Sequence, residues 1–249
     1  MPRFFPEDPI DPSLDWLVIR GDSYRHIRDV LRLRAGDSVT VCDGALNDMT
    51  CVIDEFLPDD GLVLVIKERQ INQREPSYHV TLYQGLAKGD RMDSIMQKAV
   101  ELGVSRIVPT ACRHSVLRLE NRDLNKRQIR WQRIATEAAK QCGRGRIPEV
   151  CLPLPFSEAV REAASADIAL IPWENEQEND LRTVMENIAP KPDPRISILI
   201  GPEGGFAADE ISAALALNIQ PVTLGRRILR TETAGPAVLA MLIYAFRDF

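Results

Sequence analysis

The residues best placed to do chemistry lie in one glycine-rich turn, residues 201–205 (GPEGG). The turn follows a short apolar run, residues 196–200, which is typical of a strand buried on both faces. Three glycines in five residues permit positive φ angles and a close approach between backbone and ligand. Residues 206–211 then start a helix with acidic residues in its first turn. A strand, a glycine-rich turn and a helix together predict a ligand site at the carboxyl end of a strand in an α/β sheet.

The class of ligand is narrowed by two patterns that the turn does not match. The sequence around it fits neither G-x-x-x-x-G-K-[ST] nor G-x-G-x-x-G, the patterns of phosphate and dinucleotide sites. Glu203 in the middle of the turn would repel a polyphosphate, so it suits a cationic or hydroxyl-rich ligand. The alternative interpretation is a tight turn with a structural role alone.

A second stretch, residues 224–237 (LGRRILRTETAGPA), has the same order of a short strand, a turn and a helix. The strand ends at Leu224. Thr231 or Thr233 is expected to cap the last helix, with Pro236 in its first turn. The rest of this helix is apolar nearly all round, which predicts that it is buried or at an interface. Two such turns close together favour a site over a purely structural role.

GPEGG and LGRRILRTETA together resemble the signature of the SPOUT methyltransferases and, within them, of the RsmE family. That family methylates N3 of a uridine in small-subunit (16S) ribosomal RNA. The segments KGDRMDSIMQKAVELGV and EAAKQCGRGRIPEV also look like RsmE segments, so the resemblance covers most of the chain. It implies a C-terminal α/β domain with a trefoil knot, S-adenosylmethionine (SAM) bound in a bent shape by the knot's loops, and a homodimer. Related enzymes that modify tRNA or large-subunit rRNA, and an RNA-binding protein without catalysis, are the alternatives.

The resemblance also suggests which residues line the SAM pocket. Because the sulfonium of SAM is already activated, the protein mainly has to position donor and acceptor. Backbone groups and apolar walls would suffice for this. Glu203 would either meet a ribose hydroxyl or the amino group of SAM, or cap its own loop. The expected set is Pro172, Glu174, Leu199, Gly201, Pro202, Glu203, Gly204, Gly205, Leu224, Gly225, Ile228, Leu229 and Arg230.

The acceptor requires a different pair of groups, because N3 of uridine is weakly acidic and must lose its proton. A carboxylate can take that proton, and a cation can stabilise the charge that develops on O2 and O4. Glu232 and Arg230 offer one of each beside the expected pocket. The alternative is that they form a structural ion pair at the helix start. The uridine must also be exposed from its stack.

The charge distribution predicts a surface for a polyanion. Residues 88–146 contain 14 Lys and Arg against 6 Asp and Glu, which gives +8. Since the whole chain carries −5, the rest carries −13. A basic middle in an acidic chain is typical of local RNA binding, although a solvated helix face is the alternative. The residues expected to contact RNA are Arg3, His26, Arg32, Lys88, Arg91, Arg144 and Arg146.

The first domain is predicted to cover residues 1–72 as a small β-barrel. Short strands are expected at 16–19, 38–42, 49–56 and 62–66, with one helical piece at 26–33. Arg3-Phe4-Phe5 and HIRDVLRLRAGD resemble the PUA-like RNA-binding domain of the RsmE family.

The second domain, residues 73–249, is predicted to be an α/β domain with a parallel sheet. Strands are expected at 80–86, 106–110 and 167–172, in addition to the one before GPEGG. Between them, helices are expected at 92–102 and from a cap at Asp123 to Cys142, followed by one at 181–188. The second of these helices carries an apolar stripe from Trp131 to Cys142.

The remaining composition excludes several classes of protein. The five cysteines contain no C-x-x-C pair, and with three histidines they show no metal-ligand spacing, so no metal is expected. No stretch approaches the length of a membrane span, and MPRFFPEDP is not a signal peptide. We therefore expect a cytoplasmic enzyme without a metal.

Overall fold

The computed structural model describes residues 1–6, 8–116, 124–186 and 192–248. The chain divides into two units, residues 1–75 with 139–147 and residues 76–138 with 148–249. The predicted domain boundary at residue 72 lies three residues before the end of the first stretch. The return of residues 139–147 to the first unit was not predicted. Asp123 and Ile188, expected to bound helices, lie outside the described residues.

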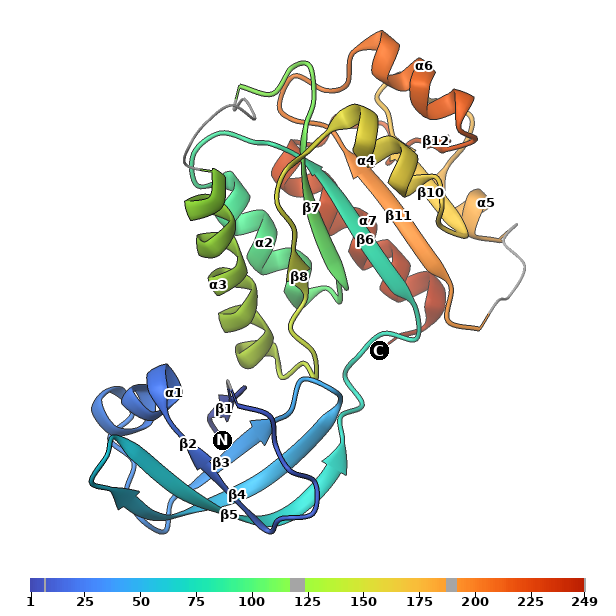
Figure 1. The fold of residues 1–249 in the computed structure, drawn as a ribbon. Coiled ribbons are helices and arrows are strands. Elements are labelled where there is room, and N and C mark those ends of the chain that lie inside the picture. Colours follow the sequence, from blue (N-terminus) through green and yellow to red (C-terminus); the bar gives the residue numbers. More distant parts are fainter. Residues whose placement is uncertain (7, 117–123, 187–191, 249) are drawn as a thin grey trace. The chain divides into compact units, whose positions relative to one another are not determined.

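The first unit is one sheet of five strands in the order β1-β3-β4-β5-β2 (Figure 1). Only the β1–β3 pair is parallel. All four predicted strands are confirmed, and the alternation of apolar residues along them builds the core, with Val39, Val41, Leu62 and Leu64 fully buried. The strands are β1 (Arg3–Phe4), β2 (Trp16–Ile19), β3 (Ser38–Cys42), β4 (Asn47–Leu57) and β5 (Gly61–Ile71).

The predicted helical piece of the first unit begins earlier than expected and changes its geometry. Helix α1 (Gly21–Arg25) is followed without a break by a short π-helix, η1 (His26–Val30). Ile27 is its buried anchor in the core. The helical piece ends before Arg32, whose φ of +53° lies in the left-handed region.

Two ion pairs are buried in the first unit, and each involves an arginine that was expected to contact RNA. Arg3 Nη2 lies 2.5 Å from Asp48 Oδ2, and Arg144 Nη2 lies 2.6 Å from Glu75 Oε2. The two arginine side chains are only 7% and 4% exposed. The expectation for Arg3 and Arg144 is therefore corrected, because both guanidinium groups are shielded from solvent and already paired.

The backbone of residues 145 and 146 is held in place within the first unit. The Glu75 carboxylate accepts hydrogen bonds from the backbone N–H groups of Gly145 (2.9 Å) and Arg146 (3.1 Å). A Cβ on Gly145 would come within 2.8 Å of Asn72 Cβ, so only glycine permits this approach.

The second unit is built on one sheet in the order β12-β10-β11-β6-β7-β8, with β9 also paired to β7. Each of these pairings is parallel, which confirms the predicted parallel sheet. The strands are β6 (His79–Gly85), β7 (Arg106–Ala111), β8 (Glu149–Val150), β9 (Leu154–Pro155), β10 (Ile168–Pro172), β11 (Arg195–Ile200) and β12 (Gln220–Val222).

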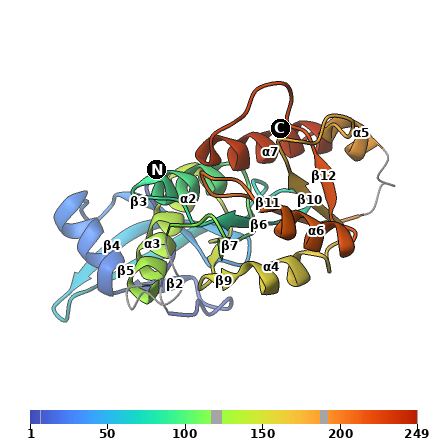
Figure 2. The same cartoon turned by 90° about the horizontal axis from the view of Figure 1, so that it is seen from above.

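Helices cover both faces of this sheet (Figure 2). Helices α2 and α7 pack together on one face, and α4 and α6 lie on the other. The predicted stripe of α3 is confirmed at Trp131, Ala135, Ala138 and Ala139, all of which are buried. The helices are α2 (Arg91–Glu101), α3 (Leu124–Cys142), α4 (Phe156–Ala163), α5 (Leu181–Glu186), α6 (Ala208–Ala216) and α7 (Thr231–Phe246).

The register of the sheet brings the carboxyl ends of its central strands to one edge. Pro172 pairs with Val222, and Ile200 pairs with Gln84. Strands β6 and β11 are neighbours in the middle of the sheet. Strands β7 and β8 lie on the β6 side of this pair, whereas β10 and β12 lie on the β11 side. Such a reversal of strand order opens a crevice for ligands at the carboxyl edge. The expected trefoil knot stays a prediction.

None of the described helices is both long and apolar enough to cross a membrane. The residues that the structure describes contain no group of three or more His, Cys, Asp or Glu side chains that could hold a metal ion.

Substitution of Arg144 should destabilise the first unit. In R144A the Glu75 carboxylate stays largely buried without its charge partner, which costs about 3–5 kcal/mol of unfolding free energy. Urea unfolding measures this loss. The matched control is R146A, whose side chain is exposed and which should stay within about 0.5 kcal/mol of wild type. Equal effects of the two substitutions would contradict the buried role.

Candidate functional site

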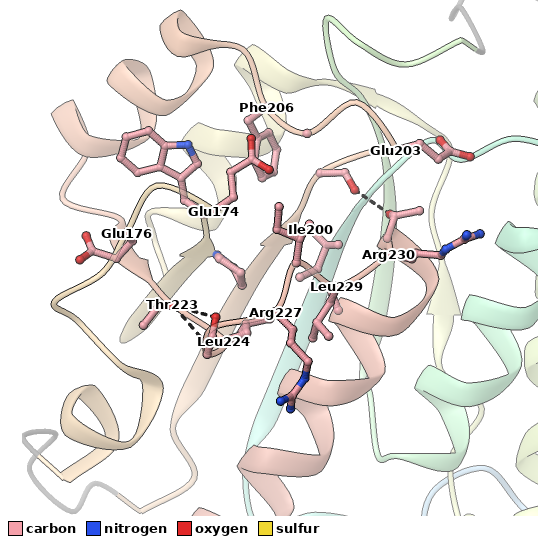
Figure 3. A pocket seen from close by; sticks show the side chains of 18 of the residues that line it. Glu174, Glu176, Ile200, Glu203, Phe206, Thr223, Leu224, Arg227, Leu229 and Arg230 are labelled. Carbon is pink, nitrogen blue, oxygen red and sulfur yellow. Dashed lines mark hydrogen bonds between the residues drawn. The ribbon is translucent and has the colours of Figure 1, made fainter.

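A pocket of about 850 Å³ opens at the carboxyl edge of the second unit's sheet (Figure 3). Its walls come from the loops that follow β10, β11 and β12 and from the first residues of α7. The lining residues are Arg91, Pro172, Trp173, Glu174, Glu176, Gln177, Ile200, Gly201, Pro202, Glu203, Gly205, Phe206, Thr223, Leu224, Gly225, Arg226, Arg227, Ile228, Leu229, Arg230, Thr231, Glu232 and Ala234.

All but two of the residues expected to bind SAM line this pocket. Leu199 does not, because side chains alternate along a strand: Ile200 lines the pocket, whereas Leu199 is buried in the core beside α4 and α6. Gly204 faces another loop, where a Cβ would come within 2.9 Å of His114 Cβ. The sequence therefore predicted the residues that line the pocket except for Leu199 and Gly204, and their binding of SAM stays a prediction.

Glu203 clamps the glycine-rich loop to the start of α2. Its Oε1 accepts a hydrogen bond from the backbone N–H of Lys88 (2.9 Å) and lies 2.7 Å from Arg91 Nη1. Partial burial raises the pKa of Glu203, but these hydrogen bonds and the charge of Arg91 outweigh it and hold the pKa below its usual value. The ionised carboxylate is thus occupied by the protein, which favours the loop-cap interpretation.

The start of the loop is fixed by Thr231, which was expected to cap α7. Arg230 occupies the cap position instead. The Thr231 hydroxyl donates to the Gly201 carbonyl (2.6 Å) and accepts from Gln84 Nε2 (2.9 Å). Pro236 lies in the second turn of α7 rather than in the first. The tie from α7 to Gly201 was missed, because it joins residues 30 positions apart.

Gly85 allows the loop to pass directly over the end of β6. A Cβ on Gly85 would lie 2.8 Å from the Gly201 carbonyl carbon and 2.7 Å from Pro202 Cδ, closer than real Cβ contacts come. At the other end of the loop, His114 Nδ1 lies 2.9 Å from the Gly204 carbonyl oxygen. The sequence carried no signal for either contact, since both depend on which strands are neighbours.

Glu232 at the start of α7 has one paired and one unpaired carboxylate oxygen. Its Oε1 lies 3.5 Å from Arg91 Nε. Its Oε2 is buried and has no hydrogen-bond partner among the residues that the structure describes. A buried carboxylate oxygen without a donor is costly, so it indicates a position that a ligand completes.

The loops that wall the pocket carry charges of both signs. Glu174 and Glu176 belong to the loop after β10, whereas Arg226, Arg227 and Arg230 belong to the loop after β12 (Figure 3). Carboxylates suit ammonium, sulfonium and hydroxyl groups, and guanidinium groups suit carboxylates and phosphates. The site therefore favours a ligand with groups of both signs over a polyphosphate.

The remaining residues expected to contact RNA are divided between the two units. Arg32 and Arg146 are exposed in the first unit, where His26 is half-buried with its ring edge-on to Phe4. Lys88 is exposed in the second unit, while Arg91 is paired as described above.

The chain is similar to known RNA methyltransferases. The model of a family described as RNA methyltransferase domain matches residues 73–243, and that of RNA methyltransferase PUA domain matches residues 19–55. Ribosomal RNA small subunit methyltransferase E of Bacillus subtilis is 31% identical over 228 residues, which cover 91% of this chain and 89% of that protein.

Two solved structures with bound SAM are also similar. One is a ribosomal RNA small subunit methyltransferase E from Neisseria gonorrhoeae, with 32% identity, a TM-score of 0.86 and coverage of 98% of this chain and 97% of that one. The other is a protein from Legionella pneumophila, with 30% identity, the same TM-score and the same coverage.

Addition of one methyl group at Gly85 should disrupt the pocket. In G85A the new Cβ meets backbone atoms of residues 201 and 202, so the glycine-rich loop must move. We expect at least roughly tenfold weaker binding of SAM, the ligand expected from the sequence, because small misplacements of a site are costly. Calorimetry measures the affinity. G61A is the control, since its Cβ would meet only flexible side chains; unchanged affinity in G85A would contradict the close approach.

Proposed function

The chain belongs to the RsmE family of RNA methyltransferases, and from this premise we propose that it transfers a methyl group from SAM to N3 of a uridine in small-subunit ribosomal RNA. The observation that carries the proposal is the pocket at the carboxyl edge of the sheet, which is walled by the two motifs that resemble the family. Its unpaired Glu232 oxygen supplies the polar group that the reaction requires.

The residues of the pocket fit SAM. Its volume lies within the range of small-molecule sites, and its glycines leave backbone N–H and C=O groups accessible to adenine and ribose. Glu174 and Glu176 suit the cationic and hydroxyl groups of SAM, whereas a polyphosphate would be repelled there. When bound, SAM supplies an activated methyl group on its sulfonium.

Glu232 and Arg230 are proposed as the groups that act on the uridine. The Oε2 atom of Glu232 takes the proton from N3, and Arg230 stabilises the negative charge that then spreads to O2 and O4. Arg91, whose Nε lies 3.5 Å from Glu232 Oε1, holds the carboxylate in place. The alternative of a structural ion pair between Arg230 and Glu232 finds no support, since the nearby guanidinium is that of Arg91.

Binding of the ribosomal RNA is assigned to exposed cations of both units. The match of residues 19–55 to a PUA domain supports RNA binding by the first unit. Arg32, Arg146 and Lys88 are exposed and are proposed to contact phosphates, as is the half-buried His26 of the first unit. Arg3 and Arg144 take no part, because both are buried in ion pairs. We place the enzyme in the cytoplasm, where it would meet this RNA.

We also propose that the protein is a homodimer and that α7 supplies the interface. Met241 and Tyr244 of this helix are 41% and 78% exposed, and Ala237 and Ala240 continue the same face at helical spacing. A contiguous exposed apolar stripe is typical of a protein–protein contact.

Removal of the charge of Glu232 should lower the transfer rate. For E232Q we expect a kcat reduced by about 10²–10⁴, the usual contribution of a general base. The assay uses labelled SAM with unmodified small subunits, large subunits and tRNA, and mass spectrometry identifies the nucleoside. E158Q, exposed on α4, is the control. A labelled methyl group on another nucleoside, or in another RNA, would change the proposed acceptor. Wild-type activity of E232Q would exclude Glu232 as the base.

Introduction of one charge on α7 should weaken the proposed dimer. In M241E a carboxylate enters the apolar stripe of α7, and we expect the dimer dissociation constant to rise at least roughly 30-fold, as at an interface hot spot. Analytical ultracentrifugation measures this constant. I129E is the matched control, because Ile129 is also exposed, at 66%, but lies on α3. An unchanged association state in M241E would remove α7 from the interface.

A further inference from the structure

The rim of the pocket carries two arginines that the protein itself does not neutralise. Arg226 and Arg227 are exposed, and neither guanidinium has an ion pair or hydrogen bond with any residue that the structure describes. Figure 3 shows the Arg227 side chain directed away from Glu174 and Glu176, the acidic side chains across the pocket. By contrast, Arg91 and Arg113 of the same unit both pair with carboxylates. Unpaired cations next to a pocket attract anionic partners.

An exposed apolar side chain follows these arginines directly. Ile228 is 82% exposed, although isoleucine is among the residues most often buried in proteins. Arg226, Arg227 and Ile228 therefore present two charges and one apolar group in three consecutive positions.

The local backbone holds these three residues at the mouth of the pocket. The loop turns at Gly225, whose φ is +101°. The backbone N–H of Gly225 donates to Thr223 Oγ1 (3.2 Å), which ties the turn to the end of β12. Apart from Gly225 itself and its two neighbours in the chain, no described residue has an atom within 4 Å of the place where a Cβ of Gly225 would be, so the space beside the turn is open.

We infer that residues 226–228 form the surface on which the RNA strand docks beside the target nucleotide. Arg226 and Arg227 bind the phosphates that flank the uridine, and Ile228 packs against the face of the base next to it. This inference rests on the proposed function, because a uridine that enters the pocket must leave its stack and thereby uncovers the apolar face of a neighbouring base.

The chemistry of the patch favours RNA over other occupants. A nucleic-acid strand presents phosphates and flat apolar base faces side by side, which is the same alternation as in residues 226–228. Apolar side chains also fill the gaps that unstacked bases leave in nucleic acids. A second copy of this chain would have to bring carboxylates to both arginines, and the proposed dimer contact lies on α7 instead.

The test separates the contribution of the two arginines to RNA binding from that of Ile228. Binding to unmodified small-subunit rRNA is measured by filter binding at several salt concentrations and without SAM, so that changes in the cofactor pocket do not enter. For R226Q with R227Q we expect weaker binding and a slope of log K against log salt that is smaller by about 2. R161Q is the control, because Arg161 is exposed on α4 of the same unit.

For I228S we expect about tenfold weaker binding with an unchanged salt slope, because isoleucine carries no charge. L215S is the matched control, since Leu215 is 43% exposed on α6 and should bind as wild type does. A wild-type affinity in I228S, or an unchanged slope in the double arginine variant, would overturn the inference. Dissociation of the dimer in I228S would also overturn the inference, because it would indicate that a second copy of the chain, and not RNA, covers Ile228.

The outcome is distinguishable from a failure of the proposed function. If wild-type protein binds the rRNA through residues 226–228 but transfers no methyl group to uridine, the proposed function is wrong and the docking surface stands. If wild-type protein methylates uridine and the variants bind RNA normally, the docking surface is wrong and the proposed function stands.

Discussion

The site depends on the close passage of the glycine-rich loop over the end of β6. Gly85 has no side chain, so the backbone of Gly201 and Pro202 can lie directly against it. Thr231 then holds the Gly201 carbonyl from α7, and Glu203 ties the middle of the loop to the start of α2. A loop held at several points before a ligand arrives loses little conformational entropy on binding, which favours affinity for a small molecule that reads backbone groups.

The same residue type serves different purposes in this chain according to its surroundings. Arg144 is buried against Glu75 and stabilises the first unit. Arg91 is half-exposed between Glu203 and Glu232, where it orders two segments of the pocket. Arg226 and Arg227 have no carboxylate partner among the described residues and stay available to a polyanion. Net charge and charge clusters therefore indicate a partner class, whereas burial and pairing decide which cations can meet it.

Glu232 has two carboxylate oxygens in different surroundings. The sequence left open an ion pair with Arg230 or a role as proton acceptor. In the structure, Oε1 lies near Arg91 instead of Arg230, and Oε2 is buried without a partner among the described residues, which supports the proposed role of Oε2 as proton acceptor. A carboxylate held at one oxygen keeps a defined orientation for the other, which is the condition for efficient proton transfer.

The sequence by itself determined most of the elements and the motifs, because strand and helix periodicity and turn glycines act over a few residues. It predicted the parallel sheet of the second unit, the strands of the first and the loops that wall the pocket. Only the tertiary structure decided that Leu199 faces the core, that Thr231 ties Gly201 rather than caps α7, and that Arg3 and Arg144 are buried. These outcomes rest on contacts between residues far apart in the chain, such as Arg144 with Glu75, and local patterns carry no record of such neighbours.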